Sequence, residues 1–352
     1  MIYNFQALRA FAALLVTFVH IEGFVALSGI THSQLKFGYV GVDLFFVLSG
    51  FVIVYSTSRR TPSAMEFMRH RIVRVAPIYW LLTLFLFVLA LIAPSLLNST
   101  SADIGDLLKS LGFIPYRKEN GLVQPVLFVG WTLNYEMFFY LVFAVFLWLT
   151  QSRVRRTVVL SSLLIAAVVI AGHLAQPASV VLNFFAYPIV LEFVMGMWVA
   201  MAALKWPDHV SRWAWPVLIV AGSWLLLHMT ILPENPRWIY AGIPAAAILW
   251  SCLMLERQGH VASSAIIQLL GAASYALYLS HPFVLQAIAK LIAPYNTPVL
   301  GLIAALLAIM LAHVVGVAIH LWIEKPLVGL FRRRHNPASS PATAQPAPGD
   351  AS

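Results

Sequence analysis

The sequence predicts an all-α, polytopic membrane protein built as a bundle of about ten transmembrane helices. Hydrophobic residues make up 61% of the 352-residue chain, and charged residues make up only 10%. Soluble domains are closer to half apolar and a quarter charged. The apolar residues also fall into runs of roughly 20, the length that crosses a bilayer as a helix. We therefore expect a multi-pass membrane protein.

Ten apolar runs follow one another along the chain. We place them near residues 7–28, 38–57, 75–93, 131–151, 157–173, 180–203, 214–232, 238–256, 265–291 and 298–322. The ninth run contains Pro282, and we expect its helix to bend or break there because proline lacks the backbone donor. In the one substantial outer loop, residues 94–130, the positions of Asp103, Asp106 and Lys109 predict a short interfacial helix.

The distribution of positive charge predicts the orientation of the bundle. Basic residues gather after the second, fourth, sixth, eighth and tenth runs, for example at 59–60, 153–156 and 332–334. Because such loops stay in the cytoplasm, we expect these loops and both termini to be cytoplasmic. These basic loops account for the net charge of +9, so the charge does not indicate binding to nucleic acid.

The chain divides into two parts by composition. Residues 1–335 form one transmembrane domain, and the Pro-, Ala- and Ser-rich residues 336–352 predict a disordered cytoplasmic tail. Cys252 is the only cysteine, which excludes an intrachain disulfide and a cysteine-based metal cluster. We expect no metal site.

The first run carries two ionisable residues that a lipid-facing helix would exclude. Arg9 lies near its start and His20 lies eleven residues later. On an α-helix this offset points both side chains within roughly 20° of one direction, about 16 Å apart along the axis. Ionisable groups at membrane depth usually face a polar interior or a partner. The pair therefore indicates a polar path that enters the membrane from one face.

Arginines precede the third run at Arg69, Arg71 and Arg74. Arg71 and Arg74 lie on neighbouring parts of one helical face, and guanidinium groups bind phosphate through two hydrogen bonds at once. The alternative is that these arginines only set the topology of the loop.

Two carboxylates lie inside apolar runs. Asp43 enters the second run from the outer side, and Glu136 lies one or two turns into the fourth. Asp43 could orient a histidine or accept its proton, or it could be a solvated residue or a helix cap. Glu136 needs a partner, because an unpaired carboxylate in an apolar setting is costly.

Further polar and aromatic residues share faces with these groups. Tyr140 follows Glu136 by four positions, and Ser274, Tyr278 and His281 fall on one side of the ninth run. Tyrosines are also common in the interfacial belts of membrane proteins, and His281 beside Pro282 could be structural.

Five motifs in order resemble the membrane acyltransferase-3 family. They are Arg9 with ten residues before His20, Gly41-Val-Asp43-Leu-Phe-Phe-Val-Leu-Ser49-Gly50, Arg69-x-Arg71-x-x-Arg74 with Pro77-x-Tyr79-Trp80, Trp131-Thr-Leu-x-x-Glu136-x-x-Phe139-Tyr140, and Ser274-Tyr275-x-x-Tyr278-Leu-x-His281-Pro282. The resemblance covers about residues 3–332. The opening Asn4-Phe-Gln-Ala-Leu-Arg9 is most similar to the exopolysaccharide (ExoZ-like) branch.

This resemblance implies an O-acyltransferase of the cell inner (plasma) membrane. The family moves an acyl group, here expected to be acetyl, from cytoplasmic acyl-CoA to a hydroxyl, often of an exopolysaccharide or lipid-linked sugar. Acyl-CoA is then a co-substrate, with no permanently bound cofactor, and polysaccharide-synthesis proteins are possible partners.

Roles for individual residues follow from the resemblance together with the predicted topology. We expect His20, Asp43 and Glu136 in catalysis, and Arg9, Arg69, Arg71 and Arg74 in acyl-CoA binding. The acceptor-side or structural residues are Trp131, Tyr140, Ser274, Tyr275, Tyr278 and His281. His20 would be a general base or a transient acyl carrier.

Two other classes remain as alternatives. A transporter or flippase of a glycan or its precursor would also hold polar residues at mid-membrane. A non-enzymatic scaffold for polysaccharide synthesis would leave the buried ionisable residues unexplained.

Overall fold

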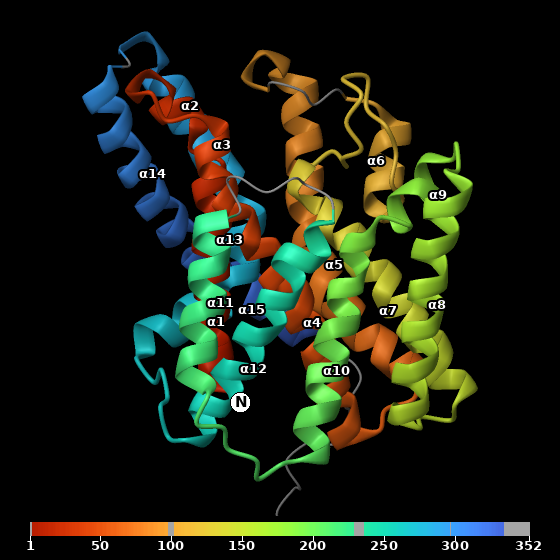
Figure 1. Cartoon of the computed structure of the whole chain (residues 1–352). Coiled ribbons are helices and arrows are strands. Elements are labelled where there is room, and N and C mark those ends of the chain that lie inside the picture. The colour runs from red at the N-terminus through yellow and green to blue at the C-terminus, as the bar shows by residue number, and fades with distance from the viewer. Residues whose placement is uncertain (1, 98–101, 229–235, 296, 334–352) are drawn as a thin grey trace, which may run out of the picture.

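The computed structural model describes residues 2–97, 102–228, 236–295 and 297–333, and helices make up most of it (Figure 1). No strand is present in these ranges, where Arg117 and Val123 form an isolated bridge. The α-helices are α1 (Tyr3–Val19), α2 (Glu22–Val25), α3 (His32–Leu35), α4 (Val40–Arg60), α5 (Ala64–Ile92), α6 (Ile104–Leu111), α7 (Trp131–Leu149), α8 (Val154–Ala175), α9 (Val180–Phe185), α10 (Leu191–Lys205), α11 (Ala214–His228), α12 (Ile243–Arg257), α13 (Ala265–Ile292), α14 (Pro298–Ile319) and α15 (Lys325–Arg333). Single turns of 3-10 helix are η1 (Ala26–Ser28), η2 (Lys36–Tyr39), η3 (Pro94–Leu96), η4 (Phe128–Gly130), η5 (Pro188–Val190) and η7 (Ala293–Tyr295), and π-helical turns are η6 (Trp238–Gly242) and η8 (His320–Glu324).

The predicted all-α, polytopic bundle is confirmed. Within the described ranges, eight helices are long and apolar enough to cross a membrane, and a ninth span is possible if the bent first pair counts as one. Ala214–Leu227 adds a shorter apolar helix. Each of the ten expected runs therefore coincides with a helix over most of its described length. The predicted tail, residues 336–352, lies outside the described residues.

The first apolar run is not one straight helix. α1 ends at Val19, and the following segment Glu22–Ser28 is bent from it by 51°. The His20 imidazole Nδ1 lies 2.9 Å from the Val16 carbonyl oxygen, and the His20 backbone N–H donates to Thr17 instead. The side chain thus takes the carbonyl that the next helical turn would use, which ends the helix.

The structure corrects two details of the expected helices. We expected the ninth helix to bend or break at Pro282, and it does not break there, because α13 runs from Ala265 to Ile292 as one helix. Prolines are tolerated in membrane helices because neighbouring groups can satisfy the freed backbone carbonyls. The sixth expected run, 180–203, is divided: α9 ends at Phe185, and the membrane-length helix begins at Pro188.

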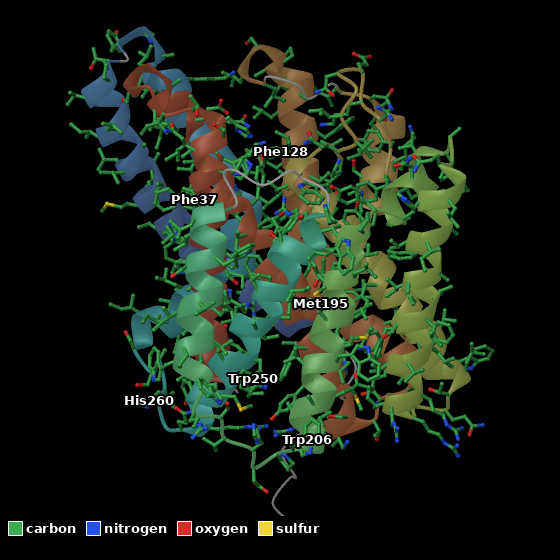
Figure 2. All side chains as sticks on the ribbon, viewed as in Figure 1. Phe37, Phe128, Met195, Trp206, Trp250 and His260 are labelled. Carbon is green, nitrogen blue, oxygen red and sulfur yellow. The ribbon has the colours of Figure 1, made fainter. Side chains whose placement is uncertain are left out.

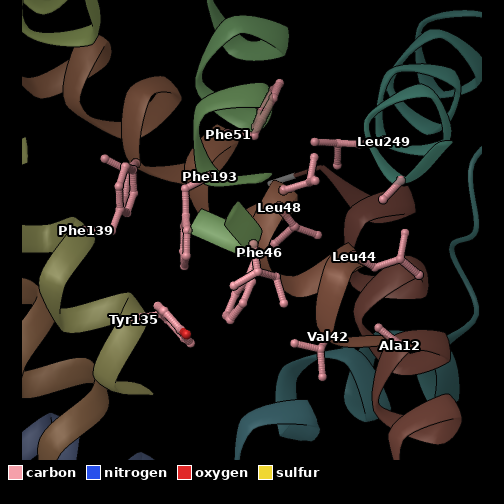
Figure 3. Close-up of a cluster of buried hydrophobic side chains, with 14 of the residues drawn as sticks. Ala12, Val42, Leu44, Phe46, Leu48, Phe51, Tyr135, Phe139, Phe193 and Leu249 are labelled. Carbon is pink, nitrogen blue, oxygen red and sulfur yellow. The ribbon is translucent and has the colours of Figure 1, made fainter. Parts of the chain in front are cut away.

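Close helix packing forms the centre of the bundle. α4 and α10 cross at Gly50 and Gly196, where a Cβ on Gly196 would lie 1.8 Å from the Val47 carbonyl oxygen. Small residues allow such backbone contact in membrane proteins. Beside the crossing, the Phe193 ring stacks against Phe46 and Phe139, each with centroids 4.6 Å apart (Figure 3).

The two ends of the bundle differ in structure. We call the end that carries the N-terminus the amino end; there, Glu256 of α12 accepts hydrogen bonds from the backbone N–H groups of Tyr3 and Asn4. We call the opposite end, which carries α2, α3 and α6, the α6 end (Figure 1). The short helix expected in the loop of residues 94–130 is present as α6, whose first turn is capped by the Asp103 carboxylate.

Candidate functional site

Arg9 and His20 line three of the cavities in the part of the bundle that the structure describes. A cavity of about 620 Å³, the amino-end cavity, includes Gln6, Arg9, Arg59 and Arg257. A smaller central cavity of about 150 Å³ also includes Arg9. A third cavity of about 310 Å³, the α6-end cavity, includes His20. Arg9 therefore faces two of the three spaces, and His20 faces the third.

Arg9 and His20 both contact α13, as their eleven-residue offset predicts. The Arg9 Nε donates to the Ser274 Oγ at 3.2 Å, and the His20 Nδ1 lies 3.2 Å from the His281 Nε2. Ser274 and His281 are seven residues apart on α13, which is two turns of helix. The polar residues of α1 and α13 thus face each other inside the bundle.

The central cavity gathers most of the charged residues that the motifs contain. Its polar lining consists of Arg9, Ser49, Arg71, Arg74, Thr132, Glu136, Tyr140, Ser274, Tyr275 and Tyr278. These side chains come from α1, α4, α5, α7 and α13, so the cavity exists only because distant segments pack together. Three guanidinium groups and one carboxylate surround it.

The three arginines of α5 have different surroundings. Arg71 donates to the Ser56 Oγ at 2.8 Å, and its guanidinium carbon lies 5.9 Å from the centre of the Tyr140 ring. Arg74 forms an ion pair of 2.9 Å with Glu324. Both arginines line the central cavity, whereas Arg69 does not. The structure therefore brings two of the three arginines to the cavity.

Glu324 is a residue that sequence reasoning missed. Its carboxylate is 1% exposed and lies at the end of the π-helical turn η8. One oxygen pairs with Arg74, and the other lies 2.7 Å from the His320 Nδ1. In the sequence, Glu324 lies just after the last apolar run, beside Lys325 and Pro326, and looks like an ordinary helix end.

Glu136 is held by two hydroxyl groups. Ser49 donates to its Oε1 at 2.8 Å, and the Tyr140 hydroxyl donates to the same oxygen. In the part of the chain that the structure describes, Glu136 and His20 form no hydrogen bond with each other. Glu136 belongs to the central cavity, and His20 belongs to the α6-end cavity.

The contacts of His20 and His281 determine their proton positions. A carbonyl oxygen cannot donate, so the His20 Nδ1 at 2.9 Å from Val16 and the His281 Nδ1 at 3.2 Å from Leu277 must both carry hydrogen. In the neutral pair, the single hydrogen of the His20 Nδ1 is then shared between the Val16 carbonyl oxygen and the His281 Nε2, which both accept it. The His20 Nε2 is left with a free lone pair, which a base or a nucleophile needs.

Asp43 pairs with an arginine and not with the histidines. Its fully buried carboxylate accepts two hydrogen bonds from Arg237, at 2.9 and 2.7 Å. Arg237 also donates to the Tyr39 carbonyl oxygen. Arg237 thus ties the start of η6 to α4, a contact that only the packing reveals.

The remaining predicted residues divide between the central cavity and the packed core. The Tyr275 hydroxyl donates to the Val75 carbonyl, and the Tyr278 hydroxyl lies within hydrogen-bonding distance of Val129 and Thr132. The Tyr278 ring also lies 6.2 Å from that of His281. Tyr278 and His281 thus lie between the central and α6-end cavities. Trp131 packs against Phe46 and does not line the central cavity.

The described residues contain no group of three or more His, Cys, Asp or Glu side chains arranged to hold a metal ion. The charged or titratable groups that line the cavities are guanidinium, carboxylate, imidazole and the ammonium group of Lys290. These can bind anions and move protons.

Comparison with known proteins identifies the class. The chain belongs to the acyltransferase-3 family, because the model described as an acyltransferase domain matches residues 2–321. It is therefore a membrane acyltransferase, and the resemblance inferred from the five motifs is confirmed.

The chain is also similar in sequence to two curated proteins. It is 34% identical over 309 residues to the exopolysaccharide production protein ExoZ of Rhizobium meliloti (strain 1021), covering 86% of this chain and 94% of the relative. It is 28% identical over 389 residues to the acyltransferase MdmB of Streptomyces mycarofaciens, covering 97% of this chain and 95% of the relative. No solved structure matches the chain.

Proposed function

We propose that this membrane acyltransferase moves an acyl group from cytoplasmic acyl-CoA to a hydroxyl of a surface glycan or its lipid-linked precursor. The observation that carries the proposal is the series of cavities through the bundle, with arginines toward the amino end and a histidine with a free Nε2 toward the α6 end. The amino end is the cytoplasmic end in this proposal, because its loops carry the excess of arginine.

The amino-end cavity suits the coenzyme. It includes three arginines, Arg9, Arg59 and Arg257, and the Arg59 guanidinium lies 4.5 Å from the centre of the Tyr55 ring. Guanidinium groups bind phosphate well, and an aromatic ring can pack against a base. Arg257 also donates to three backbone carbonyls, which fixes its position at the cavity wall.

The central cavity suits the thioester end of acyl-CoA. Arg9 borders both this cavity and the amino-end cavity, so a narrow arm could pass beside it from one to the other. Arg71 and Arg74 add positive charge on the α5 side. Glu136 contributes the carboxylate of this cavity, and we propose that it takes part in acyl transfer through Ser49 and Tyr140.

His20 acts on the acceptor by one of two routes. As a general base, its Nε2 takes the proton of the hydroxyl while the hydroxyl oxygen attacks the thioester carbon, and the proton then passes to the departing thiolate. As a carrier, Nε2 attacks the thioester first, and the hydroxyl then displaces the acyl group from the imidazole. Both routes end with one ester and one free thiol.

The relatives and the motifs support proposals for the acceptor, the donor, the location and the partner proteins. ExoZ is named for exopolysaccharide production, so we propose an exopolysaccharide or its lipid-linked oligosaccharide as the acceptor. We further propose acetyl-CoA as the donor, the cell inner membrane as the location, and polysaccharide-synthesis proteins as partners.

One experiment tests the proposal directly. The purified full-length protein in lipid nanodiscs would be incubated with labelled acetyl-CoA and surface glycan isolated from a strain that lacks the gene. We expect labelled ester on the glycan and free CoA in equal amounts. The His20→Ala variant should lower the rate by about 10²–10⁴-fold, the usual contribution of a positioned base. Wild-type protein that forms no ester would contradict the proposal.

The same protein in sealed proteoliposomes tests the transporter alternative. A series of cavities through a bundle also suits a transporter, and a flippase would need no acetyl-CoA. Movement of the glycan without consumption of acetyl-CoA would favour that class over acyl transfer.

A further inference from the structure

The α6-end cavity has the size and the composition of a small-molecule site. Its volume of about 310 Å³ lies at the lower end of the usual range of roughly 300–1,000 Å³. Such sites combine apolar and aromatic walls with a few polar groups. The walls here include Phe24, Phe128 and Leu285, and the polar groups are His20, Gln286 and Lys290.

Two of these polar groups, Gln286 and Lys290, lie on one face of α13. Pro282, Gln286 and Lys290 are four residues apart and therefore share one face of the helix, and all three line the cavity. Lys290 is fixed at the end of this face by hydrogen bonds to the carbonyl oxygens of Leu96 and Ser95. Gln286 forms no hydrogen bond with the described residues, so its amide is available to a ligand.

One aromatic ring stands directly beside the reactive histidine. The Phe128 ring centroid lies 5.3 Å from that of His20, and the Phe128 side chain is half-buried toward the α6 end (Figure 2). The face of an aromatic ring carries partial negative charge, which attracts the positively polarised C–H groups of a sugar ring. A sugar packed on Phe128 would place its hydroxyls close to the His20 Nε2.

Gly23 of α2 also lines the cavity and is exposed, and a Cβ added there would meet no atom within 4 Å. A side chain at this position would enter the open space at the edge of the cavity without displacing the protein.

We propose that the α6-end cavity is the acceptor site, in which a sugar ring packs on Phe128, the Gln286 amide binds its hydroxyls, and one hydroxyl reaches the His20 Nε2. This inference rests on the proposed function. The ester bond forms between the hydroxyl oxygen and the acyl carbon, the acyl–sulfur bond breaks, and the hydroxyl proton ends on the thiol of CoA. Gln286, Phe128 and Gly23 are then residues that determine which acceptor is accepted.

Three variants test the acceptor site: Gly23→Leu, Phe128→Ala and Gln286→Leu. The control is Gly222→Leu on α11, because a Cβ at Gly222 also meets no atom within 4 Å and Gly222 lines none of the three cavities. Each protein would be assayed in nanodiscs with acetyl-CoA and the same unesterified glycan. The binding of acetyl-CoA would be measured on each preparation to verify that it is folded.

The expected result is selective for the acceptor. Phe128→Ala and Gln286→Leu should raise the KM for the glycan by about tenfold, the effect of roughly 1.4 kcal/mol of lost contact, while acetyl-CoA affinity stays unchanged. Gly23→Leu should abolish ester formation, and Gly222→Leu should behave as wild type. If the wild type esterifies the glycan and the three variants match it in KM, the acceptor site is elsewhere. Failure of the wild type itself would instead contradict the proposed function.

Discussion

At the scale of single residues, the His20–His281 pair has a defined chemical asymmetry. Two backbone carbonyls, of Val16 and Leu277, fix both Nδ1 hydrogens. His281 is fully buried, whereas His20 reaches a cavity. We therefore propose that His281 is a positioning residue, which accepts from the His20 Nδ1–H and so orients the His20 ring.

Replacing His281 tests this positioning role. In His281→Phe the ring is kept but the acceptor is lost, so His20 retains only its bond to Val16. We expect kcat to fall by about tenfold, less than the loss from removing the base itself, with unchanged acetyl-CoA affinity. The pH dependence of kcat should also shift, since His281 no longer contacts His20. A pH profile identical to wild type would show that His281 only fills space.

The Asp43–Arg237 pair should behave as a stabilising contact. Asp43→Ala leaves the guanidinium of Arg237 buried without its carboxylate, and breaking a buried pair costs about 3–5 kcal/mol. Thermal unfolding in detergent should therefore begin at a lower temperature. The double variant Asp43→Leu with Arg237→Met removes both charges and should recover part of the loss. If the double variant is stable but inactive, Asp43 takes part in catalysis, as the motif led us to expect.

Substitutions at Arg71 and Arg69 provide a test and a matched control for coenzyme binding. Arg71 lines the central cavity and Arg69, two residues earlier on the same helix, does not. Arg71→Ala should weaken acetyl-CoA binding by about tenfold, since a charged hydrogen bond contributes roughly 1.5–3 kcal/mol, and Arg69→Ala should leave it unchanged. Calorimetry on both variants measures the difference. Equal losses would indicate a general effect of positive charge near the loop.

At the scale of helices, irregular turns carry the charged contacts. α1 ends where the His20 side chain takes the Val16 carbonyl. The π-helical turn η6 begins directly after Arg237, and the π-helical turn η8 contains Glu324. Arg237 and Glu324 each pair with a residue far away in the chain. Such turns are often found at functional sites because they shift a side chain out of helical register. The spacing of apolar residues in the sequence does not predict these irregular turns.

The α4–α10 crossing depends on its glycines. A Cβ at Gly196 would lie 1.8 Å from the Val47 carbonyl oxygen, so Gly196→Ala must separate the two helices. We expect a destabilisation of about 1–3 kcal/mol, as for overpacked cores, with a lower unfolding temperature and less folded protein in the membrane. Gly222→Ala is the control, because its added methyl group meets nothing. Unchanged stability of Gly196→Ala would mean that the crossing adjusts freely.

At the scale of the whole molecule, the order of the cavities fits the proposal that each substrate enters from its own end of the bundle. The central cavity joins α1, α4, α5, α7 and α13, and the other two cavities lie toward the amino end and the α6 end. With the amino end in the cytoplasm, donor and acceptor approach from opposite sides, and neither needs to cross the membrane. This entry of donor and acceptor from opposite sides requires that the amino end of the bundle faces the cytoplasm.

The orientation can be measured with single cysteines. In a Cys252→Ala background, a cysteine at Asn120, in the loop at the α6 end, should react with an impermeant thiol reagent added to intact cells. A cysteine at Arg155, at the start of α8, should react only after the cells are opened. The reverse pattern would invert the bundle and place acyl-CoA at the wrong end for this proposal.

Much of the architecture could be predicted from the sequence. Runs of apolar residues of membrane length locate helices directly, since each helix satisfies its own backbone in lipid. The eleven-residue spacing of Arg9 and His20 predicted that both would face one neighbour, and both contact α13. The short helix α6 was likewise signalled by its own charged residues.

The sequence by itself determined the class of fold, the helices and the polar residues that must face inward, because these follow from hydropathy and local spacing. Only the tertiary structure decided their partners: Asp43 with Arg237, Arg74 with Glu324, His20 with His281. The first two pairs join residues 194 and 250 positions apart, and the third spans 261. No local pattern encodes such contacts, because they depend on which helices pack together and on the small turns that set each side chain's direction.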